Sequence, residues 1–107
     1  MAVLIDPPSW PGPGGLLWSH LVSDGCYEEL HEFARRLGVP ERAFDRDHYD
    51  VPETVYGRAV LLGAEPVSSR ELVRRLRAAG LRRPKFRSPA GQPPRFPAGR
   101  PPRSSGG

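Results

Sequence analysis

The stretch LLWSHLVS, residues 16–23, decides the fold, because its run of apolar side chains has the length and composition of a β-strand. Leu17, Ser19, Leu21 and Ser23 share one parity, while Trp18, His20 and Val22 share the other. Side chains of a strand point alternately to opposite faces, so neither face of this segment is cleanly polar. We therefore predict a strand in the interior of the protein.

Two shorter segments extend this sheet. AVLI, residues 2–5, is a continuous apolar run that Asp6 and two prolines stop, which predicts a first buried strand. The proline- and glycine-rich PPSWPGPGG, residues 7–15, is a loop by composition. Residues 64–67 form either a loop or a third short strand.

Three helices are predicted after the second strand. The first begins at Asp24, ends at Gly38 and has one apolar face, made of Cys26, Leu30, Phe33, Ala34 and Leu37. The second begins near Asp50, which would cap it with a proline in the first turn, and ends at Gly63.

The third helix opens with SSRE, residues 68–71, a Ser-x-x-Glu capping box, and ends at Gly80. Its Arg70, Arg74 and Arg77 face outward. The order of elements predicts an α/β fold: a small single-domain sandwich with a short two- to three-stranded sheet and three helices.

Charge divides the 107 residues into two parts. Residues 1–81 hold nine arginines and all twelve acids, whereas residues 82–107 hold six arginines, one lysine and no acid. The second part also holds seven of the fourteen prolines and little that could fill a core. Such a segment cannot offset its ordering entropy, which predicts a compact domain at 1–81 and a disordered basic tail at 82–107.

The tail is a candidate interaction element. Its basic side chains would contact the phosphates of nucleic acid or another polyanion, independently of sequence and weakened by salt; the candidates are Arg82, Arg83, Lys85, Arg87 and Arg95. Phe86 and Phe96 could stack on bases. Two alternatives remain open: the proline spacing docks a protein partner, or the tail is a dispensable, solubilising extension.

Other classes of protein lack their signals here. One cysteine allows no internal disulfide, and its predicted place on a buried helix face favours an inert thiol. The N-terminus does not resemble a signal peptide and no apolar run is long enough to span a bilayer, so we expect a soluble, cytoplasmic protein. Walker and G-x-S-x-G motifs do not occur.

Polar residues next to the strands are the first candidates for chemistry. Asp6 and Asp24 follow the two strands directly, at the end where ligands bind in open α/β sheets. The alternative for both is a structural cap. His20 lies inside an otherwise apolar strand and therefore needs a partner, for which a nearby carboxylate would suffice. His31 borders the apolar face of the first helix and is either a packing residue or a ligand.

The cluster FDRDHYD, residues 44–50, is the second candidate. Asp45, Asp47, Asp50 and His48 supply the oxygen and nitrogen ligands that suit magnesium, manganese or zinc. An EF-hand calcium loop is excluded, because the sixth position is not glycine and the twelfth is not glutamate. The alternative is a solvated loop in which Arg46 neutralises the carboxylates.

These residues define a candidate divalent-metal site made of Asp6, His20, Asp24, His31, Asp47, His48 and Asp50. With a metal bound, carboxylate and imidazole ligands would fit a phosphoester hydrolase or nuclease-like protein. The alternative is a non-catalytic binding or accessory module whose tail contacts nucleic acid or a protein partner. Three or more ligand atoms converging within about 4–5 Å would favour the metal site, given ligand distances near 2.0–2.6 Å.

The chain also resembles a known family. IDPPSW, LWSHLVSD, ELHEFARRLG, FDRDHYDV and GAEPVSSRELVRRL together are similar to the bacterial and phage family called domain of unknown function 4031. The resemblance runs from Met1 to about Leu81 and implies no particular activity. The motifs that carry it contain His20, Asp24, His31, Asp47, His48, Tyr49 and Asp50.

Overall fold

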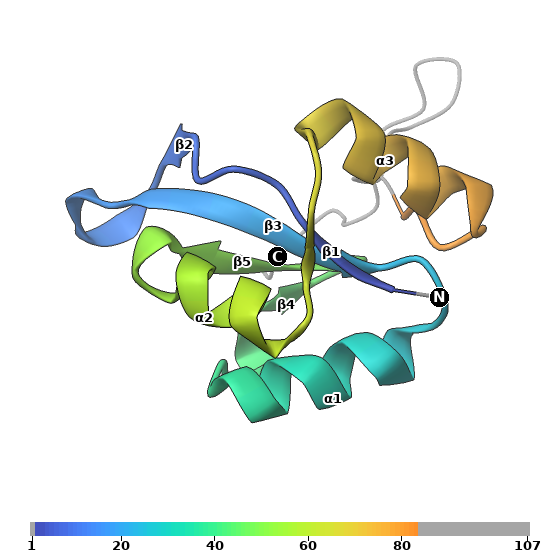
Figure 1. Cartoon of the computed structure of the whole chain (residues 1–107), viewed down its shortest axis with the longest axis horizontal. Helices are drawn as coiled ribbons and strands as arrows, with labels where there is room; N and C mark the ends of the chain where they lie inside the picture. The colour runs from blue at the N-terminus through green and yellow to red at the C-terminus, as the bar shows by residue number, and fades with distance from the viewer. Residues whose placement is uncertain (1, 84–107) are drawn as a thin grey trace, which may run out of the picture.

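A six-stranded mixed sheet forms the centre of the protein, in a computed structural model that describes residues 2–83 (Figure 1). Its strands are β1 (Val3–Ile5), β2 (Trp10–Pro11), β3 (Leu17–Ser23), β4 (Phe44–Asp45), β5 (His48–Pro52) and β6 (Glu65–Pro66). The order across the sheet is β4-β5-β3-β1-β6, and β2 pairs with the start of β3. β6 runs parallel to β1, and the other pairs are antiparallel. The predicted interior strand is therefore confirmed as the central one.

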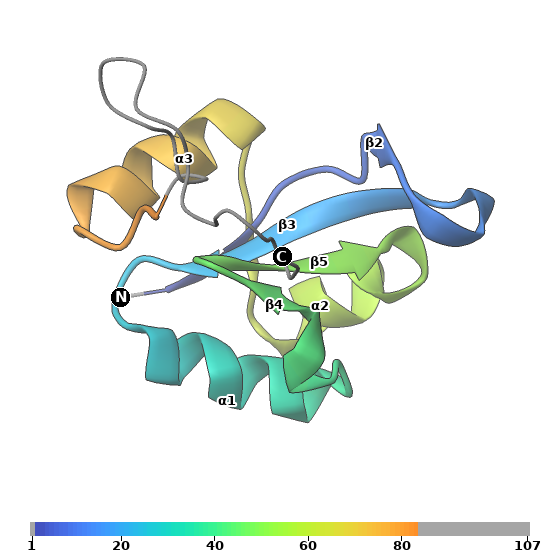
Figure 2. The same ribbon diagram turned by 180° about the vertical axis from the view of Figure 1, so that it is seen from behind.

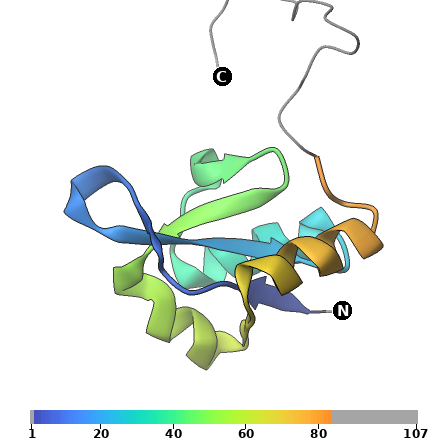
Figure 3. The same ribbon diagram turned by 90° about the horizontal axis from the view of Figure 1, so that it is seen from above.

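Helices cover the two faces of this sheet unequally. α1 (Tyr27–Leu37) and α2 (Tyr56–Leu62) lie against one face, and α3 (Ser69–Ala78) lies against the other (Figures 1 and 2). We call the first the lower face and the second the upper face, as Figure 1 draws them. Seen from above, α3 crosses one end of β3, while the other end extends beyond it (Figure 3). Part of the upper face thus has no helix over it.

The hydrophobic core divides in the same way. Eleven buried residues pack below the sheet, including Leu21 of β3 and Leu30 of α1. Only four buried residues pack between the sheet and α3, namely Leu4, Val22, Leu72 and Leu76. The alternation along β3 explains the division, because Leu21 points down while His20 and Val22 point up.

The sheet is larger than the two to three strands predicted, and the predicted start of the second helix near Asp50 was wrong. Residues 48–52 form β5, and a 3₁₀ turn at Glu53–Val55 leads into α2 at Tyr56. Tyr49 and Val51 alternate with polar neighbours and are fully buried in the lower core. This burial outweighs the local capping signal that an Asp before a proline gives. Gly63 ends α2 as predicted, with a left-handed φ of 119°.

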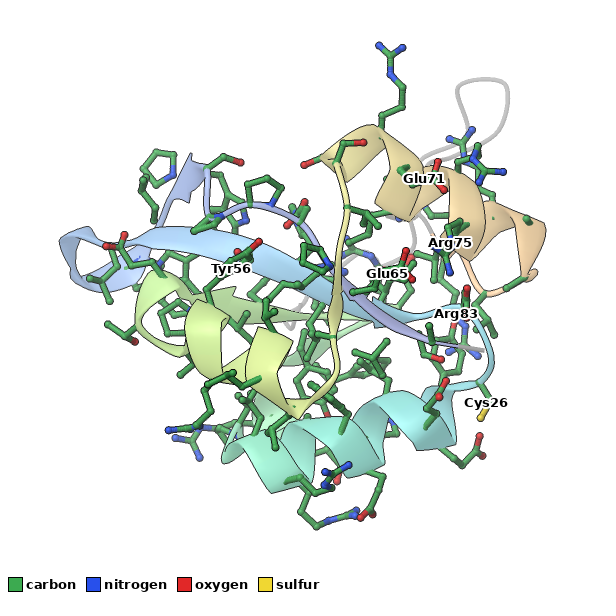
Figure 4. All side chains as sticks on the ribbon, in the orientation of Figure 1. Cys26, Tyr56, Glu65, Glu71, Arg75 and Arg83 are labelled. Atoms are coloured by element: carbon green, nitrogen blue, oxygen red, sulfur yellow. The ribbon has the colours of Figure 1, made fainter. Side chains whose placement is uncertain are left out.

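The first helix also begins differently from the prediction. Cys26, half-buried, is the N-cap residue of α1, and its Sγ accepts a hydrogen bond from the backbone N–H of Glu29 at 3.4 Å. The cysteine therefore precedes the helix and does not line its buried face (Figure 4). The capping serine of α3 is as predicted, with Ser68 Oγ accepting from the N–H of Glu71 at 3.0 Å.

A lipid bilayer would need a longer and more apolar helix than any found between residues 2 and 83.

Candidate metal centre

Three polar side chains meet on the upper face of the sheet, beside α3. The register of β3 and β5 places His20 directly opposite Asp50. His48 precedes Asp50 by two residues and so points to the same face of β5. One ring nitrogen of each histidine and one oxygen of Asp50 all lie within 4.8 Å of one another. Two strands that are distant in sequence thus supply one ligand cluster, which we call the triad.

A buried carboxylate contacts the Nδ1 atom of His20. Asp6, which is 1% exposed at the end of β1, places its Oδ2 2.9 Å from His20 Nδ1. Its two oxygens also accept the backbone N–H of His20 (2.6 Å) and the hydroxyl of Ser69 (2.7 Å). Burial would raise the pKa of Asp6, but these hydrogen bonds outweigh it and the pKa lies below its ordinary value. An ionised Asp6 fixes the proton on Nδ1 and leaves Nε2 free.

A second buried carboxylate holds His48 in the same way. Asp47, also 1% exposed, has its Oδ1 2.8 Å from His48 Nδ1. Its Oδ2 accepts from Arg82 Nη1 at 2.9 Å and from the backbone N–H of Arg83 at 2.7 Å. Burial raises the pKa of Asp47, but the bonds from His48, Arg83 and Arg82 outweigh it, so that the pKa lies below its ordinary value. Both histidines therefore present Nε2 to the triad.

The turn of the β4–β5 hairpin brings Asp47 to this position. Arg46 at its tip has a φ of 60°, a left-handed conformation that costs a non-glycine residue about 1–3 kcal/mol. The turn buries Asp47 and leaves Asp45 exposed, where it pairs with Arg46 Nη1 at 3.2 Å. Within FDRDHYD, Arg46 thus neutralises Asp45, while His48 and Arg82 neutralise Asp47.

The electrostatics of the triad favour a positive charge at His48. Burial lowers the pKa of His48, but Asp50 Oδ1, 3.0 Å from Nε2, and Asp47 together outweigh this, and the pKa lies above its ordinary value. A metal ion that replaced the Nε2 proton would meet the Asp50 carboxylate, while Asp47 stays on Nδ1. Metal binding at such a site releases a proton.

A pocket of about 210 Å³ opens beside the triad, between the sheet and α3. His20, His48 and the two buried carboxylates line it on the sheet side, and Leu72, Val73 and Leu76 of α3 line it on the other. Arg46 and Arg82 line it as well. Asp50 instead lines a second, more open hollow of about 460 Å³ together with Trp10 and Trp18. The triad therefore lies between an apolar-walled pocket and an aromatic hollow.

The segment before β3, which includes β2, packs closely around the tryptophans of the aromatic hollow. The Trp10 ring stacks on His20 with centroids 5.8 Å apart and lies 6.0 Å from Trp18. Trp18 Nε1 donates to the carbonyl of Pro13 at 3.1 Å. A Cβ added at Gly12 would lie 2.6 Å from the Trp18 ring, so only glycine fits there.

Two of the predicted metal ligands lie away from the triad. His31 lies below the sheet, where its Nδ1 is 2.7 Å from the Tyr49 hydroxyl and its ring packs on Phe44. Asp24 binds the backbone N–H of Ala2 (2.6 Å) and pairs with Arg75 Nη2 (2.7 Å). Arg75 also reaches Glu65, beside which it lies in Figure 4. The alternative structural reading fits both residues, although Asp24 tethers α3 and does not cap α1.

The structure adds one residue to the site and gives two others a new place. Ser69 was not predicted, and only its position in the first turn of a helix could have drawn attention to it. Arg82 and Arg83, predicted as tail residues that bind nucleic acid, contact the domain through Asp47, and the Arg83 guanidinium lies 4.4 Å from the centre of the Tyr27 ring. Lys85, Arg87 and Arg95 lie outside the described residues.

Comparison with known proteins identifies a family whose description names no activity. Residues 3–79 match the model of the family described as "Protein of unknown function (DUF4031)". No curated protein and no solved structure matches the chain. The match covers every element that builds the triad and the whole of α3. The chain therefore belongs to the DUF4031 family, as its motifs predicted.

Proposed function

We propose that this domain binds a divalent metal ion through His20 Nε2, His48 Nε2 and the carboxylate of Asp50. One observation carries the proposal: each histidine has its Nδ1 on a buried, hydrogen-bonded carboxylate. Histidines that ligate metals almost always donate their other N–H to such a partner, which fixes the ring and raises its basicity. Asp6 and Asp47 therefore belong to the proposed site as orienting residues.

The ligand set favours zinc among the metals considered. Imidazole nitrogens suit zinc, whereas magnesium prefers carboxylate and water oxygens. Ligand atoms about 2.1 Å from a tetrahedral zinc ion stand about 3.4 Å apart. The spacings in the triad, from 3.0 Å up to 4.8 Å, include this value and require small side-chain rotations. Three protein ligands leave the fourth position open, as in catalytic zinc sites.

Hydrolysis of a phosphoester is the activity that we infer for this site. The metal would supply a Lewis acid and lower the pKa of a bound water. Arg46 and Arg82 line the adjoining pocket and would neutralise the charge of a phosphate group there. Leu72 and Leu76 form an apolar wall that limits the access of bulk water.

Calorimetric titration of the chelator-treated protein with Zn²⁺ tests the proposal. We expect the wild type to bind one ion per chain. Changes to residues that orient a ligand lower metal affinity by about 10–100-fold, and His20→Ala, which removes a ligand, should lower it by more. His31→Ala is the matched control, because this third histidine bonds Tyr49 below the sheet. Equal affinity in the wild type and His20→Ala would sink the metal site. Zinc-dependent cleavage of bis(p-nitrophenyl) phosphate then tests the hydrolase.

A second candidate is a non-catalytic binding module. It is favoured by the fact that Asp47 and Asp50 occupy both ring nitrogens of His48 with hydrogen bonds. In this case the triad and Asp47 would order the β4–β5 hairpin, and Asp47 would fix the segment after α3 through its hydrogen bonds from Arg82 and Arg83. Zinc binding without any cleavage of the phosphoester would support this candidate over the hydrolase.

A further inference from the structure

Charge is segregated within the described part of the chain. Residues 69–83, which comprise α3 and the segment after it, hold six arginines and one acid. Residues 2–68 hold five arginines and eleven acids. A basic element thus lies across an acidic body. Such a field attracts polyanions to one side of the molecule.

The outward face of α3 concentrates this charge in a stripe. Arg70, Arg74 and Arg77 are all exposed and follow one another at helical spacing over about 10 Å. They line a shallow groove of about 450 Å³ together with Val73. Glu71 holds Arg74 in place through two hydrogen bonds (2.6 and 2.8 Å), whereas Arg70 and Arg77 make no ion pair within residues 2–83. We call these three residues the arginine stripe.

The groove of the stripe adjoins the pocket of the candidate metal centre. Val73 lines both, so the two hollows meet at this side chain. Within the pocket, Arg82 bonds Asp47 through Nη1, but its Nε is buried and has no partner in the described part of the chain. A buried guanidinium N–H without an acceptor is costly, and a phosphate oxygen would satisfy it.

We propose that the arginine stripe binds the phosphate backbone of single-stranded nucleic acid and leads the strand into the pocket beside the triad. This deepens the proposed function by naming its substrate class, and only the cleavage step rests on that function. A pocket of about 210 Å³ is large enough to take a phosphate group of the strand. On the far side of the triad, Trp10 and Trp18 offer rings on which bases of any sequence stack.

The test measures the binding of the full-length chain to a fluorescent single strand of about 12 nucleotides, a length typical of such sites. The chelator EDTA is present, so that neither metal binding nor cleavage contributes. The double variant R70E/R77E reverses two charges of the stripe. Its matched control, R35E/R36E, makes the same change in net charge on exposed arginines of α1, below the sheet. Residues 84–107 are common to all three proteins.

We expect R70E/R77E to weaken binding at least tenfold and R35E/R36E to change it by less than about twofold. The slope of log affinity against log salt should fall by about 1.4 in R70E/R77E, because each lost phosphate contact removes about 0.7 for a single strand. Equal losses in the two variants would show a response to net charge alone and overturn the stripe. R70Q/R77Q replaces R70E/R77E if thermal melting shows that the latter is unfolded.

Two further arms decide the partner. A duplex of the same sequence should bind more weakly than the single strand, and tighter duplex binding would overturn the single-strand assignment. Preferential, stripe-dependent binding to phosphatidylserine vesicles would make the partner a membrane and also overturn it. Zinc titration of R70E/R77E separates the two proposals: weakened strand binding with unchanged zinc affinity supports both. A wild type that binds the strand through the stripe but binds no zinc overturns the metal site alone.

Discussion

Histidines occur on both sides of the sheet, and their partners differ in kind. His31, below the sheet, is paired with the neutral hydroxyl of Tyr49 in a core of eleven buried residues. His20 and His48, above the sheet, are each paired with a buried carboxylate beside an open pocket. A hydroxyl satisfies an imidazole and lets it pack, whereas an ionised carboxylate makes its far nitrogen a better ligand. The partner, more than the histidine itself, therefore distinguishes a packing residue from a candidate ligand.

The largest effect should come from the lower core. Leu30→Ala should cost about 4 kcal/mol of the free energy of unfolding, because Leu30 is fully buried among side chains that cannot close the cavity. Leu72→Ala should cost about 2 kcal/mol, since its cluster is small and already borders a pocket. Urea denaturation of both variants measures the difference. A cost for Leu72→Ala equal to that for Leu30→Ala would break the division between a covered and an open face.

Asp6→Asn tests the upper face directly. It should lower zinc affinity by about 10–100-fold without abolishing binding, because an amide cannot fix the proton of His20 Nδ1 as a carboxylate does. Calorimetry gives the affinity, and Asp45→Asn is the control, since within residues 2–83 this exposed carboxylate pairs only with Arg46. Unchanged affinity in Asp6→Asn would mean that the buried carboxylate orients no ligand.

Asp24 tests how α3 is held over the upper face. Burial raises its pKa, but the N–H of Ala2 and the guanidinium of Arg75 outweigh this, so the pKa of Asp24 lies below its ordinary value. A carboxyl with a depressed pKa in the folded state contributes stability above its unfolded pKa of about 3.9 and loses it as the pH falls through the folded value. Asp24→Asn should therefore cost about 1.5 kcal/mol at pH 7.

The same variant provides the pH test. Urea unfolding of the wild type and Asp24→Asn between pH 7 and pH 2.5 should show the two stabilities converging below about pH 4. A constant difference across this range would show that the charge of Asp24 does not stabilise the tether to Arg75.

Local signals were sufficient for several elements. Ser68 and Glu71 predicted the start of α3, and glycines predicted the ends of α1 and α2, because these depend on neighbours within one turn. His20 also has the partner that its place in an apolar strand predicts, and this partner is Asp6 at the predicted strand end. In each case the physical requirement lies in a residue and its immediate surroundings.

Pairings distant in sequence could not be predicted in the same way. Aspartate is a residue type typical of helix N-caps, but the carboxylate of Asp24 pairs with Arg75, 51 positions later in the chain. The Asp-Val-Pro-Glu pattern at Asp50 predicts a helix start, although Tyr49 and Val51 alternate with polar residues as a half-buried strand does. The sequence contains this alternation, but it does not show which strand pairs with β5. The triad depends on that pairing, because His20 of β3 lies opposite Asp50 of β5.

The smallest expected effect belongs to the lower-face histidine. Tyr49→Phe removes the hydroxyl 2.7 Å from His31 Nδ1 and keeps the buried ring, so it should cost about 1 kcal/mol of the free energy of unfolding. Zinc affinity should stay unchanged, because His31 and the triad lie on opposite sides of the sheet. Denaturation and calorimetry on one preparation measure both quantities. A loss of zinc affinity in Tyr49→Phe would show that the two sides are coupled, and the contrast between the three histidines would then fail.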